Sequence, residues 1–150
     1  MLRLSKKADY ALIAMKHLAQ KRDLASTSAR EIAENYDIPI ELMAKVLQRL
    51  VRTGLLTSQQ GTHGGYSLSR PSTTISVADV IQAIDGPVAV TACSTDNSDC
   101  EQYGKCSIRD PLWRIRARIV EALGTVSLAE MATEIDAPPP PVVQPAILRT

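Results

Sequence analysis

Aromatic residues and long apolar segments are scarce in this 150-residue chain. It has no phenylalanine and a single tryptophan, Trp113, and aromatic residues make up only 3% of it. An aliphatic core is therefore expected, which suits helices more than a β-sandwich. No apolar run is long enough to span a bilayer, and the first residues lack the pattern of a signal peptide. These absences predict a mainly α-helical protein that is cytoplasmic and has no membrane partner.

The total net charge is also small, at +1, which taken alone is not typical of a nucleic-acid-binding protein. The charge is unevenly distributed, however. Residues 1–75 contain 11 Lys and Arg against 6 Asp and Glu, a net charge of +5, whereas residues 76–150 contain 6 against 10, a net charge of −4. This asymmetry indicates that the N-terminal half faces a polyanion and that the other half has a different task.

Three helices are predicted in the N-terminal half. The first begins after Ser5, a good N-cap residue, and continues to about Gln20. A short helix follows Ser28, and a longer one begins at Pro39 and ends before Gly54. The third helix has an apolar face and an opposite face of basic and polar residues. A short helix, a tight turn and a longer helix with a basic face are typical of helix-turn-helix DNA-binding proteins.

A glycine-rich tip between two short strand-like segments predicts a β-hairpin after the third helix. Three glycines within residues 61–65 allow the backbone to approach another group closely. We expect the third helix to enter a major groove of double-stranded DNA, and the hairpin to lie as a wing along a phosphate strand or a minor groove. The alternative is a small helical protein-interaction module with the same hairpin. The predicted DNA contacts are Ser5, Lys6, Ser28, Arg30 and Arg49 to phosphates, Glu41, Leu42, Lys45 and Gln48 near base edges, and Gly61, His63, Gly64 and Gly65 at the wing.

The cysteines Cys93, Cys100 and Cys106 lie in one polar segment and are the only three in the chain. Thiolates are ligands for zinc and for iron–sulfur clusters, and a cytosolic chain does not use them as a disulfide framework. Six residues separate the first pair and five the second, unlike the two-residue spacing of ordinary zinc fingers. A fourth ligand would have to be oxygen, nitrogen, a small molecule or a group from a partner subunit. Three free thiols or a redox disulfide pair are the alternatives.

Asp110-Pro111 is predicted to cap a long late helix that ends at Gly124. Its apolar residues recur at spacings of three and four, and they could pack on the chain's own core or on the same helix of a second chain. Because two-fold symmetric DNA sites favour dimers, we expect a homodimer. The predicted dimerisation residues are Leu112, Ile115, Ile119 and Leu123.

The expected fold is therefore mainly α: a winged helix-turn-helix domain with a small β-hairpin wing, a cysteine loop and a long dimerisation helix. Residues 1–75 are predicted to form the DNA-binding region, and residues 76–107 a linker helix with the cysteine loop. Residues 108–135 are predicted to form the dimerisation helix and a C-terminal helix, and residues 136–150 a disordered Pro-rich tail. No histidine lies near the cysteines in sequence and no carboxylates pair on a helix face, so no enzyme activity is expected.

Several motifs, in their order along the chain, resemble those of the iron–sulfur winged-helix transcription regulators that include IscR, NsrR and RirA. The most specific is the wing, residues 61–68, and the likeness extends from residue 1 to about residue 133. The other motifs are Leu2-Arg3-Leu4 before Ala8-Asp9-Tyr10-Ala11, Arg30-Glu31-Ile32-Ala33, Arg49-Leu50 with Thr53-Gly54-Leu55, Ile84-Asp85-Gly86-Pro87, and the three-cysteine loop.

The resemblance implies a homodimeric regulator, a repressor by expectation, whose operator binding is controlled by an iron–sulfur cluster that senses nitric oxide, redox state or iron and cluster supply. Cys93, Cys100 and Cys106 match the family's three cysteine ligands. In IscR-like members a histidine three residues after the last cysteine completes the site, but Arg109 stands at that position here. NsrR-like members use an aspartate from the first helix of the other subunit, and Asp9 stands at the matching place. This ligand set favours a 4Fe–4S cluster over a 2Fe–2S cluster. A cluster-free thiol redox switch on the same fold and a zinc-stabilised interaction module are the alternative functions.

Overall fold

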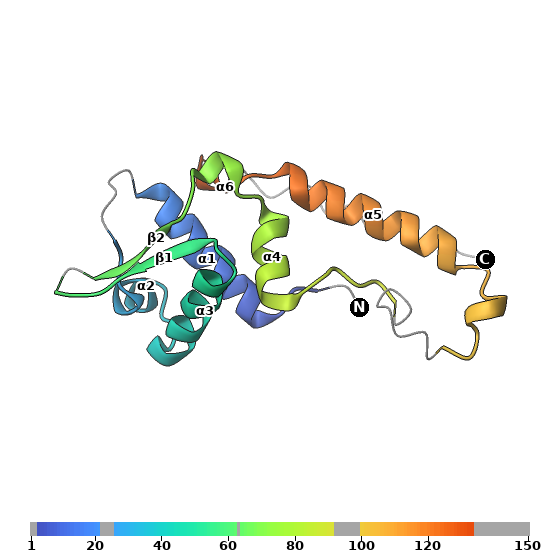
Figure 1. Cartoon of the computed structure of the whole chain (residues 1–150), viewed down its shortest axis with the longest axis horizontal. Coiled ribbons are helices and arrows are strands. Elements are labelled where there is room, and N and C mark those ends of the chain that lie inside the picture. Colours follow the sequence, from blue (N-terminus) through green and yellow to red (C-terminus); the bar gives the residue numbers. More distant parts are fainter. Residues whose placement is uncertain (1–2, 22–25, 63, 92–99, 134–150) are drawn as a thin grey trace, which may run out of the picture.

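Helices dominate the computed structural model, which describes residues 3–21, 26–62, 64–91 and 100–133 (Figure 1). The elements in chain order are α1 (Lys6–Gln20), α2 (Ala29–Asn35), α3 (Ile40–Arg52), β1 (Leu56–Gln59), β2 (Gly65–Leu68), the 3-10 turn η1 (Ser72–Thr74), α4 (Val77–Asp85), the 3-10 turn η3 (Tyr103–Lys105), α5 (Arg109–Thr125) and α6 (Leu128–Thr133). This order confirms a mainly helical chain with a small β-hairpin after the third helix. The predicted Pro-rich tail lies outside the described residues.

Serine N-caps set the start of three helices. The hydroxyls of Ser5, Ser28 and Ser76 each accept a hydrogen bond of 3.1 Å from the backbone N–H three residues further on. At α4 the Ser76 N–H also donates to the Asp79 carboxylate at 2.9 Å, which completes a capping box. A cap of this kind stabilises a helix by about 1 kcal/mol. After the C-terminal end of α3, Gly54 has a φ of +83°, as expected for a residue that ends a helix.

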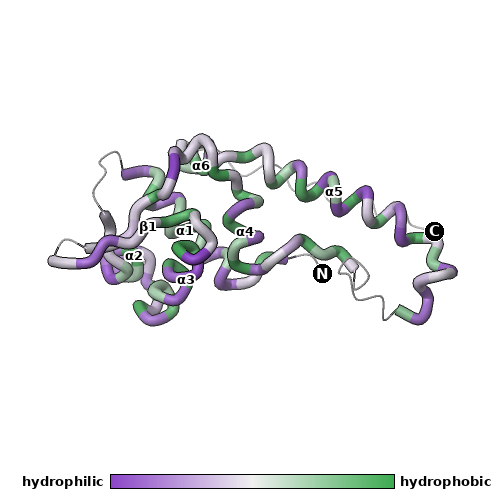
Figure 2. The backbone as a smooth tube through the Cα atoms, in the orientation of Figure 1, coloured by the Kyte–Doolittle hydropathy of each residue, from purple (hydrophilic) through white to green (hydrophobic). Residues whose placement is uncertain are grey.

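One aliphatic core joins α1, α2, α3, α4 and α6. Figure 2 shows the hydrophobic stretches of α1, α3 and α4 where these helices meet. The largest fully buried apolar side chains are Met15, Ile32, Met43, Leu47, Leu50, Ile75, Val80 and Leu128. Leu128 opens α6, and its N–H donates to the Ile75 carbonyl at 2.9 Å. The chain therefore returns to its N-terminal half after α5, and α6 completes the core there.

The hairpin is attached to the start of α2 by a short backbone ladder. β1 and β2 pair antiparallel, with Leu56 opposite Leu68. Thr27 and Tyr66 exchange two backbone hydrogen bonds of 3.0 and 2.8 Å, so the residue before the Ser28 cap extends the hairpin's edge. At Gly65 a Cβ atom would lie 2.6 Å from the carbonyl carbon and oxygen of Thr27. The close approach expected at this glycine is therefore made to the chain's own backbone.

Gly65→Ala is expected to lower the free energy of unfolding by about 1–3 kcal/mol, the usual cost of forcing an extra carbon into a packed site. The added methyl group would collide with backbone atoms of Thr27, which cannot move aside as a flexible side chain would. Urea unfolding followed by circular dichroism measures the change. Gly104→Ala is the matched control, because a Cβ there meets nothing within 4 Å. An equal effect of both substitutions would contradict this role for Gly65.

The long helix α5 extends away from the helical body (Figure 1). It begins at Arg109 and ends at Thr125, one residue beyond each predicted boundary. Asp110 therefore lies in its first turn and is not its cap, and Gly124 continues the helix because its φ is not positive. None of the α5 side chains is buried within this chain. No helix within the described ranges has the length and apolar character needed to cross a membrane.

Candidate nucleic-acid interface and cysteine site

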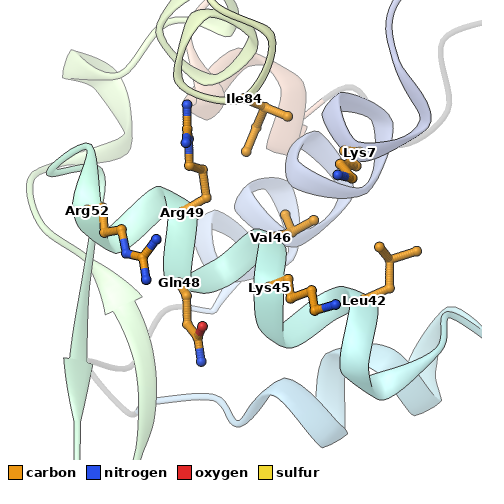
Figure 3. Close-up of a pocket in the computed structure, with 8 residues that line it drawn as sticks. All are labelled: Lys7, Leu42, Lys45, Val46, Gln48, Arg49, Arg52 and Ile84. Atoms are coloured by element: carbon orange, nitrogen blue, oxygen red, sulfur yellow. The ribbon is translucent and has the colours of Figure 1, made fainter.

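The exposed face of α3 lines a groove of about 380 Å³ that is rich in positive charge (Figure 3). Lys45, Gln48 and Arg52 lie on its α3 wall, and Lys7 reaches it from α1. With Arg49, four cations line the groove, and there is no carboxylate among its described lining residues. Such a concentration of one charge on an exposed helix face attracts the phosphates of DNA.

A second groove of about 420 Å³ lies between α3, the start of α2 and the hairpin. Gln48 and Arg52 line both grooves, and Ser28, Gln60 and Gly65 belong to the second. The basic face of α3, the N-terminal end of α2 and the base of the hairpin therefore form one continuous surface. A recognition helix with a neighbouring wing has this arrangement in winged-helix proteins.

The other predicted DNA contacts differ in how exposed they are. Arg30 and Glu41 are exposed on α2 and α3, and Gly61 is exposed at the tip of the hairpin. Leu42 lines the first groove, while Gly64 packs inside the tip, where a Cβ would lie 2.6 Å from the Gln59 carbonyl oxygen. His63 lies outside the described residues.

Lys7 and Arg52 line the groove but are absent from the predicted contacts. Arg52 lies seven residues after Lys45, a spacing that repeats on one helix face, so this signal was available in the sequence. Lys7 is different, because only the packing of α1 beside α3 shows that Lys7 faces the groove. Its neighbour Lys6 instead lies 5.5 Å from the centre of the Tyr10 ring on α1.

Two predicted phosphate contacts are bonded to α4 in this structure. The Nε atom of Arg49 donates to the carbonyl of Ala83 at 3.1 Å, at the C-terminal end of α4, where a cation suits the helix dipole. Ser5 donates to Asp85 from its hydroxyl and from its N–H, the latter at 3.2 Å. The last turn of α4 therefore fastens both the recognition helix and the start of α1.

The described part of the cysteine segment, residues 100–106, lies at the far end of α5 from the helical body (Figure 1). Cys100 is exposed and Cys106 is half-buried, on either side of η3, and both are free thiols. Cys93 lies outside the described residues. Among the described residues no three potential ligands come together. Asp9 lies on α1 within the body, so one chain does not bring its carboxylate to Cys100 and Cys106.

Arg109, at the first position of α5, connects that helix to η3. Its Nη1 atom donates to the Tyr103 carbonyl at 3.0 Å. The guanidinium carbon lies 4.6 Å from the centre of the Tyr103 ring and 5.7 Å from that of Trp113. The hydrogen bond to the Asp110 carboxylate raises the pKa of Arg109 above its ordinary value, so the side chain is always a cation.

The predicted dimerisation residues fall into two groups along α5. Ile119 and Leu123 line an apolar groove of about 330 Å³ against the N-terminal segment and the residues after α4. Leu112 is half-buried, and Ile115 is 46% exposed. Trp113 is 43% exposed, so the half of α5 nearest the cysteines presents large apolar side chains to solvent.

Comparisons with known proteins agree with this arrangement. The Rrf2 family, described as iron-dependent transcriptional regulators, matches residues 4–134. The HTH-type transcriptional regulator IscR of Xenorhabdus nematophila is 34% identical over 131 residues, which are 87% of this chain and 79% of that protein. The global cysteine regulator CymR of B. subtilis superposes with a TM-score of 0.72 at 29% identity, covering 91% of this chain and all of CymR. IscR of T. potens gives a TM-score of 0.70 at 26% identity, covering 90% of this chain and 89% of that one. The chain therefore belongs to the Rrf2 family and is a DNA-binding transcriptional regulator, not an enzyme.

Proposed function

We propose that the protein is a homodimeric regulator, acting as a repressor, whose binding to an operator is controlled by an iron–sulfur cluster in the cysteine loop. The observation that carries the DNA-binding part is the groove lined by Lys7, Lys45, Arg49 and Arg52. Lys45 and Gln48 lie exposed on α3, where a recognition helix presents side chains to base edges. The tip of the hairpin then follows the phosphate strand beside the groove.

The donor chemistry of the cysteine segment fits a cluster. Cys100 and Cys106 are free thiols that solvent can reach, and thiolates are the ligands of iron–sulfur clusters. Arg109 stands at the start of α5, three residues after Cys106, and its guanidinium contacts the Tyr103 carbonyl between the two thiols. When bound, the cluster would supply a centre that reacts with nitric oxide or oxidants and that depends on iron supply. The family's iron dependence and the IscR relatives support this reading, and three thiolates with a carboxylate favour 4Fe–4S over 2Fe–2S.

A second subunit follows from the position of α5. This helix has 17 residues, so it carries η3 about 25 Å along its axis away from α6. Because α5 buries none of its side chains within the chain, we infer that its exposed apolar residues pack on a partner subunit. In that dimer, Asp9 of the partner subunit is the carboxylate that completes the site of Cys93, Cys100 and Cys106.

The end of α4 is the connection between the cysteine loop and the recognition helix. The Ala83 carbonyl accepts a hydrogen bond from Arg49 of α3, and the Asp85 carboxylate accepts one from Ser5 of α1. Val88, in the segment that leads toward the cysteines, accepts a hydrogen bond from Arg116 of α5. A change in the position of the loop would therefore pull on contacts that orient α3. The dimer would then shift between DNA-binding and non-binding arrangements.

Anaerobic purification tests the cluster directly. We expect a coloured protein that contains iron and sulfide and that binds a defined operator differently with and without the cluster. A colourless zinc protein, prepared anaerobically with iron supplied, would overturn the cluster proposal. Iron-free protein whose DNA binding responds to oxidants would instead identify a thiol redox switch. Zinc without any shift of DNA would identify an interaction module.

Asp9→Ala is expected to shorten the lifetime of the cluster about tenfold or more, because the loss of a group that only orients a ligand already has effects of this size. Absorbance after addition of an iron chelator measures the lifetime. Glu34→Ala, which removes an exposed carboxylate from α2, is the matched control. Equal lifetimes and spectra in Asp9→Ala and wild type would remove Asp9 from the ligand set.

A further inference from the structure

The cysteine turn, residues 100–106, has little apolar surface of its own to hold it in place. It consists of the 3-10 turn η3 with Cys100 before it and Cys106 after it. Two backbone hydrogen bonds of 3.0 Å, from Tyr103 to Cys100 and from Lys105 to Gln102, shape the turn internally. Neither of these bonds fastens the turn to α5. A separate contact is needed to fix the direction in which the two thiols lie relative to the helix.

Arg109 makes that contact with its whole guanidinium group. Nη1 donates to the carbonyl of Tyr103 inside η3, and Nε donates to the Asp110 carboxylate on α5 at 3.2 Å. The guanidinium carbon lies over the Tyr103 ring, 4.6 Å from its centre, and over the Trp113 ring, 5.7 Å from its centre. The group therefore bridges η3 and the first turns of α5 by hydrogen bonds and by ring contacts together.

An exposed ion pair alone would contribute little to this attachment. The guanidinium, however, is planar and can donate hydrogen bonds in its plane while its faces contact aromatic rings, which an ammonium group cannot do in the same way. Tyr103 and Trp113 are 37% and 43% exposed, so these rings are not held by the core. Arg109 is their described link across the junction of turn and helix.

We propose that Arg109 is a positioning residue that fastens the cysteine turn to α5 and so holds Cys100 and Cys106 in place for their cofactor. Arg109 cannot itself be a ligand, because its guanidinium has no free acceptor for a metal. Its effect on the cofactor rests on the proposed iron–sulfur function, whereas the attachment of the turn does not. The two parts can therefore be tested separately.

The cofactor-free protein tests whether Arg109 packs at this junction between Tyr103 and Trp113, because Trp113 is the single tryptophan of the chain. In full-length Arg109→Gln we expect a red shift of the tryptophan emission and stronger quenching by acrylamide, since the guanidinium no longer covers that side of the ring. Arg118→Gln makes the same chemical change on an exposed residue of α5 further from Trp113, and it should leave both quantities unchanged. Emission and quenching in Arg109→Gln that equal those of wild type would overturn the proposal. Circular dichroism of each variant shows whether α5 remains folded.

The reconstituted protein tests the consequence for the cofactor. Loss of a group that orients ligands commonly weakens metal binding 10–100-fold, so we expect Arg109→Gln to lose its cluster to a chelator about tenfold faster than wild type. Arg109→Lys keeps the charge without the planar group and should also lose it faster. A fully restored lifetime in Arg109→Lys would show that charge alone acts and would overturn the positioning role. If wild type itself forms no cluster, the proposed function fails, while the tryptophan measurement still decides whether Arg109 packs at the junction of turn and helix.

Discussion

Replacing Lys45 and Arg52 together by glutamate is expected to weaken operator binding at least about 100-fold at moderate salt. Both residues line the groove on α3, and the double change puts two carboxylates where phosphates approach. Each lost phosphate contact also removes the release of a counterion. The slope of log K against log salt should therefore fall by about 2 units for the pair if both contact phosphates. Fluorescence anisotropy with labelled operator at several salt concentrations measures affinity and slope.

The matched control reverses two charges elsewhere. Arg114 and Arg118 are exposed on α5, the helix that extends away from the body containing α3 (Figure 1). Changing both to glutamate alters the net charge by the same amount but should leave the salt slope unchanged. Equal losses in the two double variants would show that total charge, and not the groove, governs DNA binding. An unchanged affinity in the Lys45 and Arg52 variant would refute the placement of DNA on α3.

Cys106→Ala is expected to remove essentially all of the cluster from anaerobically purified protein. The proposed site has only three thiolates, and the chain contains no further cysteine that could replace one. Two thiolates and a carboxylate are a poor ligand set for an iron–sulfur cluster, which is normally held by four protein ligands. Iron and sulfide assays together with the visible absorbance measure the loss. Operator binding by the same variant then shows whether the cluster-free form binds DNA.

Ser107→Ala is the control for this experiment, because it changes the exposed residue next to Cys106 without removing a thiol. It should keep the iron content and absorbance of wild type. A Cys106→Ala protein with undiminished iron and sulfide would exclude Cys106 as a ligand. If Cys106→Ala loses its iron while its operator binding equals that of wild type, the wild-type protein holds a cluster that does not control operator binding.

Much of the fold follows from local signals in the sequence. Ser5 and Ser28 act as N-caps where the sequence predicts them, and Gly54 ends α3 with a positive φ. The hairpin appears where the glycines predict a tip. These features depend on a few neighbouring residues, so they can be found without knowing the fold. Helix α5 continues past Gly124 to Thr125. A glycine that ends a helix takes the left-handed conformation, and Gly124 does not.

The interactions that orient the candidate site do not have local signals. Arg49 bonds to Ala83 and Ser5 to Asp85, at sequence separations of 34 and 80 residues. Both residues are among the predicted phosphate contacts. Only the packing of α4 against α1 and α3 shows that these residues also bond to Ala83 and Asp85 of α4. The basic character of the α3 face, in contrast, follows from helical spacing alone.

The return of the chain at Leu128 changes how the arm formed by the cysteine segment and α5 can act. This arm leaves the body after α4 and re-enters it at α6. There the Val77 N–H donates to the Val126 carbonyl and the Leu128 N–H donates to the Ile75 carbonyl, each at 2.9 Å. The described residues at its two ends, in α4 and α6, thus belong to the same core. A displacement at the Arg109 end of α5 would therefore act on the helical body through both α4 and α6. In the proposed dimer, such a displacement would reach α3 through α4 and through α6, so both anchors together would set the position of the recognition helix.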